Sequence, residues 1–200
     1  MLEIGARGAE PTWASYYHAH ERRAPHRTLR EAVARFAVPG TAIDLGCGSG
    51  NETIHLLHGG WKVLAIDRQP EAAAFLEPRL PAQLRTAIDL RVAGFEDIVL
   101  PPADLVFAGF SIPFCHPSRF DALWTQICKA LRPGGRFAGQ LFGVEDDWSQ
   151  NAKMTFHSRA RVEHLFEGFD VENLDEVCGP ERSYAGPKRW HVFHVIARKR

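Results

Sequence analysis

The sequence predicts an α/β fold: a doubly wound, mostly parallel seven-stranded sheet with helices on both faces and an antiparallel last strand. Short apolar runs alternate along the chain with amphipathic stretches, an order typical of parallel sheets covered by helices. The run 103–108 is nearly all apolar, as expected for a strand buried on both faces. Glycines and acidic residues follow the ends of several of these runs, where such a sheet places its ligands.

The first half of the chain predicts a helical start followed by strand–helix units. Residues 13–36 have helical spacing, interrupted at Pro25, and Pro39 with Gly40 ends this region. Gly59 and Gly60 close a second helix, and Pro70 suits the first position of a third. The elements expected up to residue 108 are strands at 41–45, 61–66, 90–93 and 103–108, and helices at 51–58 and 70–76.

The second half predicts the remaining strands and two further helices. The run Arg132-Pro133-Gly134-Gly135 indicates a sharp turn, and Ser158 suits the N-cap of the last helix. The elements expected here are helices at 117–131 and 158–166, and strands at 136–142, 169–177 and 190–197.

Composition and length limit the class of protein. The 200 residues suit one domain, with 1–38 as an N-terminal helical cap and 39–200 as the core. Lys plus Arg and Asp plus Glu both number 24, and this zero net charge argues against a general nucleic-acid binder. No apolar run approaches the roughly 20 residues that span a bilayer, so we expect a cytoplasmic protein. The four cysteines form no C-x-x-C pair, which predicts free thiols and no metal site.

The segment Asp44-Leu45-Gly46-Cys47-Gly48-Ser49-Gly50 is the most informative part of the chain. It predicts a buried strand that runs into a tight loop and then a helix. Glycine suits positions where the backbone takes a positive φ or approaches a ligand closely. The helix after the loop directs free N–H groups and its positive dipole end toward this point. Asp44 would lie near the charged end of a ligand there.

A nicotinamide-dependent oxidoreductase is one alternative interpretation of this loop. The dinucleotide fingerprint G-x-G-x-x-G fits Gly46 and Gly48, but its third glycine falls on Asn51. An aspartate before the loop would also repel a pyrophosphate. Asp67, after the second strand, suits a ribose in either class of enzyme and does not separate them.

The glycine segment resembles the first motif of class I methyltransferases that depend on S-adenosylmethionine (SAM), which implies a Rossmann-like fold and S-adenosylhomocysteine (SAH) as a product. The segment 131–135 resembles a late motif of the same family. Together with the first motif, segments 166–171 and 195–199 resemble the small tellurite-resistance methyltransferases, which implies oxyanions as methyl acceptors. The chain departs from the family at Phe95, where many members have an aspartate that binds adenine.

The resemblance also implies the cofactor site. Asp67 would accept hydrogen bonds from the ribose, with Arg68 beside the adenine or merely solvated. Phe95 and Glu96 would contact the adenine or form a simple turn. The aromatic N-terminal helix would close over the cofactor as a lid or only pack on the sheet. The expected cofactor-binding residues are Tyr17, Asp44, Gly46, Cys47, Gly48, Ser49, Gly50, Asp67, Arg68, Phe95, Glu96, Gly109 and Phe110.

The acceptor side is expected in the apolar loop 109–117, which contains one thiol and one imidazole. Such a loop argues against amino methylation of nucleic-acid bases and favours a small acceptor. Phe114 and His116 would border the acceptor pocket, with Arg182 on its far wall, since an oxyanion favours arginine. His116 is a candidate catalytic base, but a histidine before a proline equally suits a helix cap.

The predicted function is methyl transfer from SAM to a small molecule, such as an oxyanion or a thiol, by a monomer or homodimer without nucleic-acid or membrane partners. The second alternative is a non-catalytic SAM-binding or interaction protein on the same fold, because fold alone does not fix function. A measurement of which cofactor binds distinguishes the methyltransferase from the nicotinamide-dependent oxidoreductase. A measurement of turnover distinguishes it from the non-catalytic protein.

Overall fold

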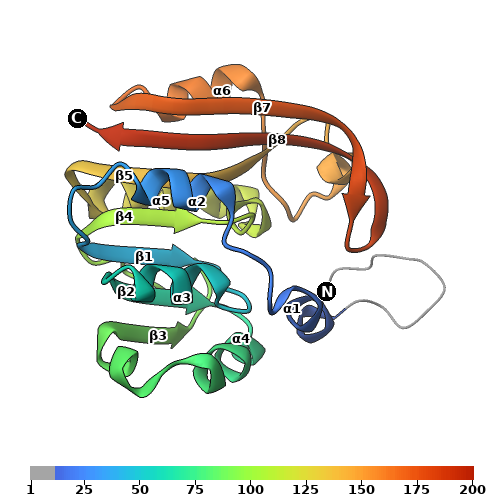
Figure 1. Cartoon of the computed structure of the whole chain (residues 1–200). Coiled ribbons are helices and arrows are strands. Elements are labelled where there is room, and N and C mark those ends of the chain that lie inside the picture. The colour runs from blue at the N-terminus through green and yellow to red at the C-terminus, as the bar shows by residue number, and fades with distance from the viewer. Residues whose placement is uncertain (1–11) are drawn as a thin grey trace.

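The computed structural model describes residues 12–200, and these form one sheet with helices on both faces (Figure 1). The strands lie in the order β3-β2-β1-β4-β5-β8-β7, and the short β6 pairs with β5. The strands are β1 Thr41–Leu45, β2 Lys62–Asp67, β3 Ile88–Val92, β4 Ala103–Ala108, β5 Leu131–Gly143, β6 Phe156–His157, β7 Phe169–Ser183 and β8 Gly186–Lys199. The α-helices are α1 Trp13–His20, α2 Arg27–Val33, α3 Asn51–His58, α4 Pro70–Leu76, α5 Pro117–Ala130 and α6 Arg159–Leu165.

The doubly wound, mostly parallel sheet is confirmed. Strands β1 to β5 pair in parallel, and β8 is antiparallel to both β5 and β7. The chain moves outward from β1 to β3 and then returns to place β4 on the other side of β1. The carboxyl ends of β1 and β4, on either side of this reversal, are the usual ligand position in open α/β sheets.

Two apolar clusters hold the helices on the sheet. The larger cluster joins α5 and α6 to one face, through Trp124, Ile127 and Val162 packed on strand residues such as Phe137. The other cluster joins α2, α3 and α4 to the opposite face, and Leu29 of α2 belongs to it. Helix α1 lies instead beyond the carboxyl ends of the strands, as Figure 1 shows.

Several predicted boundaries need correction. The sheet has eight strands rather than seven among residues 12–200, because Phe142 and Gly143 of β5 also pair with β6. The predicted turn 132–135 lies inside β5, since Leu131 already pairs with Ala103 before the register shifts. Strand β3 begins two residues earlier than predicted.

The last two strands extend well past their predicted bounds, to Ser183 and back to Gly186. Polar residues dominate this hairpin extension, so the apolar pattern that marks its buried half stops before the strands do. Within residues 12–200, the helices are all too short or too polar to span a membrane.

Candidate functional site

The glycine loop, defined as residues 46–50, joins β1 to α3 in a conformation that requires glycine. Gly46, Gly48 and Gly50 have φ values of 74°, 51° and 82°. The N–H groups of Gly46 and Cys47 donate to the Ile66 carbonyl at 2.7 and 3.0 Å, which ties the loop to β2. A Cβ at Gly46 would collide with Ser111, and one at Gly50 with Leu76. The prediction of a tight strand-to-helix loop is confirmed.

Asp67 lies at the end of β2 with its carboxylate against the glycine loop. It accepts hydrogen bonds from the Gly48 N–H at 2.9 Å, the Gln69 N–H at 2.9 Å and the Tyr17 hydroxyl at 3.2 Å. Burial raises its pKa, although the three donors oppose this shift. The structure therefore brings Tyr17, Gly48 and Asp67 together, and their contact with a cofactor stays a prediction.

Asp44 lies behind the loop rather than at its surface. Its carboxylate is 1% exposed and accepts a hydrogen bond from the Thr53 hydroxyl at 2.6 Å. Burial raises its pKa to about 7. Direct contact with a ligand stays a prediction. Sequence analysis missed Thr53, whose position in the first turn of α3, facing β1, was the available signal.

Two further residues that the sequence did not single out brace the loop. The Arg79 guanidinium donates to the Ser49 carbonyl and to the Asn51 side chain at 2.5 and 2.7 Å. The Asn51 amide in turn donates to the His20 carbonyl at 2.7 Å, at the end of α1. The N-terminal helix is thus hydrogen-bonded to the first residue of α3.

The predicted adenine-side residues also come together, though largely with each other. Arg68 donates to Glu96 at 2.6 Å across Gly94, in an exposed ion pair that connects the segments after β2 and β3. Phe95 packs against the larger apolar cluster. Their contact with an adenine stays a prediction.

Phe110 follows β4 in a strained conformation. It has a φ of 56°, and it is the single non-glycine residue with positive φ among residues 12–200. Its N–H donates to the Gln140 side chain at 3.3 Å, while Ser111 next to it donates to the Leu45 carbonyl at the end of β1. Such outliers persist only where surrounding contacts impose them, often at functional sites. Gln140 was not predicted as a site residue. The available signal was a glutamine inside the apolar run of β5, and the structure buries this side chain fully.

An aromatic cluster gathers residues of β5, β6 and β8 with residues from the segments that follow β4 and β5. It consists of Phe110, Phe114, Phe142, Trp148, Phe156 and Trp190, packed with Met154 and Val192. Trp13 of α1 meets Phe114 edge-on at 5.2 Å between ring centroids. Tyr16 meets Tyr184, at the tip of the β7–β8 hairpin, at 5.5 Å. Helix α1 therefore contacts both Asp67 and this hairpin, and its role as a lid stays a prediction.

A lysine ammonium lies inside the aromatic cluster. The Lys188 Nζ is 3.5 Å from the Trp148 ring centroid and 3.9 Å from that of Trp190. It forms an ion pair with Asp146 at 2.5 Å, and both side chains are almost fully buried. Burial lowers the Lys188 pKa, against the effect of Asp146. A buried pair of this kind fixes the positions of the surrounding rings.

His116 and Arg182 are exposed and belong neither to the contacts around Asp67 nor to the aromatic cluster. His116 is the exposed N-cap of α5, where its Nδ1 accepts from the Ser118 N–H at 3.2 Å, so the cap that the sequence allowed is present. Arg182 is an exposed residue near the hairpin tip. Phe114 belongs to the aromatic cluster. The catalytic role of His116 and the pocket roles of all three stay predictions.

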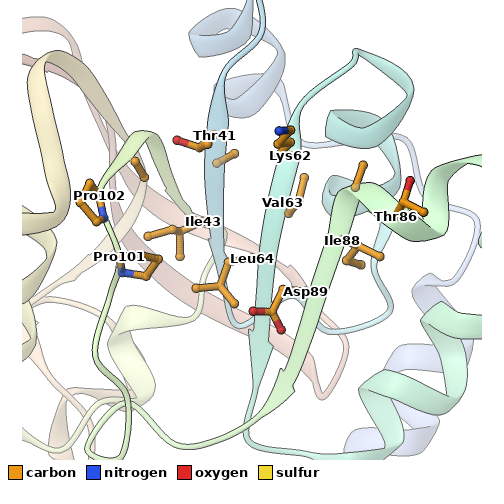
Figure 2. A pocket seen from close by; sticks show the side chains of 13 residues that line it. Thr41, Ile43, Lys62, Val63, Leu64, Thr86, Ile88, Asp89, Pro101 and Pro102 are labelled. Atoms are coloured by element: carbon orange, nitrogen blue, oxygen red, sulfur yellow. The ribbon is translucent and has the colours of Figure 1, made fainter.

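A cavity of about 300 Å³ lies at the amino ends of β1, β2 and β3, the end of the sheet opposite the glycine loop (Figure 2). It is lined by the first residues of β1, β2 and β3 and by Pro101 and Pro102. Residues 93–102 join β3 to β4 through turns and coil, so this connection provides no helix to cover the sheet. None of the predicted site residues lines this cavity.

Glu145, Cys178 and His191 form the one group of metal-ligand type among the described residues. The backbone N–H of Glu145 donates to the His191 Nδ1 at 3.1 Å, so neutral His191 carries its proton on Nε2. That Nε2 donates to Glu176 at 2.9 Å. Both ring nitrogens are thus engaged, and Arg189 contacts both the Glu145 carboxylate and the Cys178 sulfur. This arrangement opposes cation binding.

Known proteins with related sequences match part of the chain. Residues 42–135 match a family profile described as a methyltransferase domain. The carboxy-S-adenosyl-L-methionine synthase of Escherichia coli is 32% identical over 119 residues, which are 56% of this chain and 48% of that protein. The chain thus spans about half the length of the curated relatives it matches.

Solved structures extend the similarity to the whole fold. TehB from Haemophilus influenzae superposes with a TM-score of 0.77 at 15% identity, over 93% of this chain and 66% of TehB. The Burkholderia thailandensis 1,6-didemethyltoxoflavin-N1-methyltransferase, solved with its substrate and SAH, gives a TM-score of 0.64 at 22% identity, over 94% and 85% of the two chains. At such identities the superpositions show a common fold.

Proposed function

Because this chain carries a class I SAM-dependent methyltransferase domain, we propose that it transfers the methyl group of SAM to a small molecule, an oxyanion or a thiol. One observation carries the proposal: the Asp67 carboxylate is held against a loop of three positive-φ glycines at the carboxyl edge of the sheet. A cytoplasmic location is part of the proposal, and four free cysteines are consistent with a reducing compartment.

The residues present fit SAM. The Asp67 carboxylate lies against the loop and suits a positively charged cofactor, while Asp44 lies buried behind the loop. Packing against Ser111 and Leu76 leaves no space for a Cβ at Gly46 and Gly50, so the loop keeps a bare backbone at these two positions. Asp67 would hold the ribose, and Arg68 with Glu96 would flank the adenine. When bound, SAM supplies a methyl group on a sulfonium, which is a good leaving group.

The chain's own contribution is mainly positioning and the exclusion of water. Orientation of two reactants alone supplies about 7–11 kcal/mol in favourable cases. Phe110 and the aromatic cluster form an apolar boundary on the acceptor side, and Trp13 of α1 closes onto Phe114. Aromatic faces also attract a sulfonium. An anionic acceptor needs no general base, so the proposal does not depend on His116.

Turnover with a panel of small acceptors tests this function. The protein would be incubated with SAM and either selenite, tellurite or a small thiol, and SAH and methylated product would be quantified by mass spectrometry. We expect equal amounts of both with at least one acceptor, and neither with the Asp67→Ala variant. SAM binding without product from any acceptor would favour the non-catalytic alternative.

A further inference from the structure

Two histidines from distant parts of the chain stack beside Phe110. His26 is the N-cap of α2 and His194 lies on β8, and their rings are 5.5 Å apart at an interplanar angle of 9°. Their centroids are 5.5 and 6.2 Å from that of Phe110, which follows β4. The pair therefore lies beside the residue that follows β4, at the border of the aromatic cluster.

Hydrogen bonds fix which ring nitrogen of each histidine carries its proton. The Nδ1 of His26 accepts from the Thr28 N–H at 3.2 Å, so neutral His26 is protonated on Nε2. The Gln140 Oε1 accepts the Phe110 N–H, which directs the Gln140 amide nitrogen toward the histidines. That nitrogen lies 3.2 Å from Nδ1 of His26 and of His194, and 3.0 Å from the Thr28 hydroxyl.

The Gln140 amide has two hydrogens for these three acceptors. Because His26 already accepts from the Thr28 backbone, the two hydrogens go to the Thr28 hydroxyl and to His194. His194 is then also protonated on Nε2. Burial lowers the pKa of His26 to about 4 and lowers that of His194, so both rings are neutral at pH 7.

The result is a pair of neighbouring N–H donors. Both Nδ1 atoms converge on one amide nitrogen, so both Nε2–H groups point away from it, and both side chains are partly exposed. Within residues 12–200 no acceptor is bonded to either Nε2. Arg23 and Arg27 next to the pair are balanced by Glu52 and Asp175, whereas Arg30 has no ion pair with a described residue. Adjacent donors beside a positive charge suit an anionic oxygen.

We propose that His26 and His194 form a paired-donor site for one anionic oxygen, with Gln140 as the residue that positions both rings. The inference rests on the proposed function, because two anions would come to this point. One is the methionine carboxylate of the cofactor, and the other is an oxyanion acceptor. The chemistry that the two donors recognise is the same for both.

Substitution of a histidine by asparagine or glutamine distinguishes the roles of its two ring nitrogens, because the asparagine amide reaches the Nδ1 position and the glutamine amide reaches the Nε2 position. The His26→Asn variant retains a helix cap but has no donor at the Nε2 position. His194→Asn likewise reaches only the Nδ1 position, whereas His194→Gln extends an amide N–H toward the Nε2 position. Calorimetry would measure binding of SAH, of 5′-methylthioadenosine, which has no carboxylate, and of selenite to the protein with and without SAH. Thermal unfolding would verify that each variant folds.

The two sources of the anion give different results. If the site binds the cofactor carboxylate, both asparagine variants weaken SAH about tenfold and leave methylthioadenosine unchanged. If it binds an oxyanion acceptor, they weaken selenite about tenfold and leave SAH unchanged. In both cases His194→Gln restores most of the affinity. Wild-type affinity for SAH and selenite in all variants, or no selenite binding together with unchanged SAH binding, would overturn the proposal.

Failure of the proposed function has its own signature. A wild-type protein that binds neither SAH nor methylthioadenosine would lack the cofactor site. The selenite titration of the free protein would still decide the histidine pair, because it needs no cofactor.

Discussion

The Tyr17 hydroxyl donates a hydrogen bond to the Asp67 carboxylate at 3.2 Å, which connects the N-terminal helix to the residue expected to bind the ribose. Asp67 also accepts two backbone N–H groups, so three of its roughly four acceptor positions are in use. Two ribose hydroxyls would require one of these bonds to be released. The bond from Tyr17 is the one that comes from a side chain, so this contact competes with the cofactor.

The Tyr17→Phe variant tests this competition. It retains the ring over Gly48 but removes the hydroxyl, so we expect SAH to bind up to tenfold more tightly while the free protein loses about 1 kcal/mol of stability. Calorimetry and urea denaturation would measure the two effects. Tyr16→Phe is the matched control, since its hydroxyl does not contact Asp67. Weaker SAH binding in Tyr17→Phe would instead make the hydroxyl a direct contact of the cofactor.

Gly50 has the largest φ of the three glycines in the loop. Its φ is 82°, and a Cβ would collide with Leu76 of α4. We expect Gly50→Ala to lower the free energy of unfolding by about 2 kcal/mol or more, and to weaken SAH binding. Gly168→Ala is the control, because a Cβ there meets no atom within 4 Å. Equal stabilities of the two variants would show that the loop tolerates side chains.

The buried pair of Lys188 and Asp146 predicts strong coupling between two substitutions. Lys188→Met leaves the Asp146 carboxylate buried without its partner, and we expect it to cost about 3–5 kcal/mol. The double variant Lys188→Met/Asp146→Asn should recover a large part of this loss. Arg189→Met, which removes an exposed ion pair with Glu145, should change stability little. Additive losses in a double-mutant cycle would exclude a coupled buried pair.

His157 predicts a specific pH dependence of stability. Burial lowers its pKa from 6.5 to about 4, and within residues 12–200 its Nε2 has no hydrogen-bond partner. Between pH 6.5 and 4, His157 is protonated in the unfolded chain but stays neutral in the folded protein. Its contribution to the free energy of unfolding therefore becomes more unfavourable to the folded state as the pH falls. His157→Phe, beside Phe120, should therefore gain about 2 kcal/mol relative to wild type between pH 7 and pH 5. A pH-independent difference, measured by denaturation, would place the titration elsewhere.

The sequence predicted the elements that carry strong local signals. β1, α3 and α4 coincide with their predicted ranges, because a glycine loop, a double glycine and an N-terminal proline mark their ends. The hairpin β7–β8 was underestimated, since its outer half is exposed and its pairing depends on the two strands meeting rather than on an apolar pattern.

The candidate site residues also differ in how far they could be predicted from local sequence. Residues next to the glycine loop and the strand ends could be predicted as candidates, because their chemistry is local to a motif. Gln140 and His194 were missed, because each acquires its role from a partner far along the chain. Thr53 was missed although it lies in the first turn of α3, because its partner Asp44 is on the preceding strand. His26 was given no role either, because its ring interacts with Gln140 of β5 and His194 of β8, far along the chain.

Calorimetric titration with SAM, SAH and NADH, beside the Asp67→Ala variant, tests the central claim most directly. The account predicts micromolar binding of SAM and SAH, lost in the variant, and no binding of NADH. Binding of NADH alone, or of none of the three, would contradict it and leave a methyltransferase fold that does not use its cofactor site.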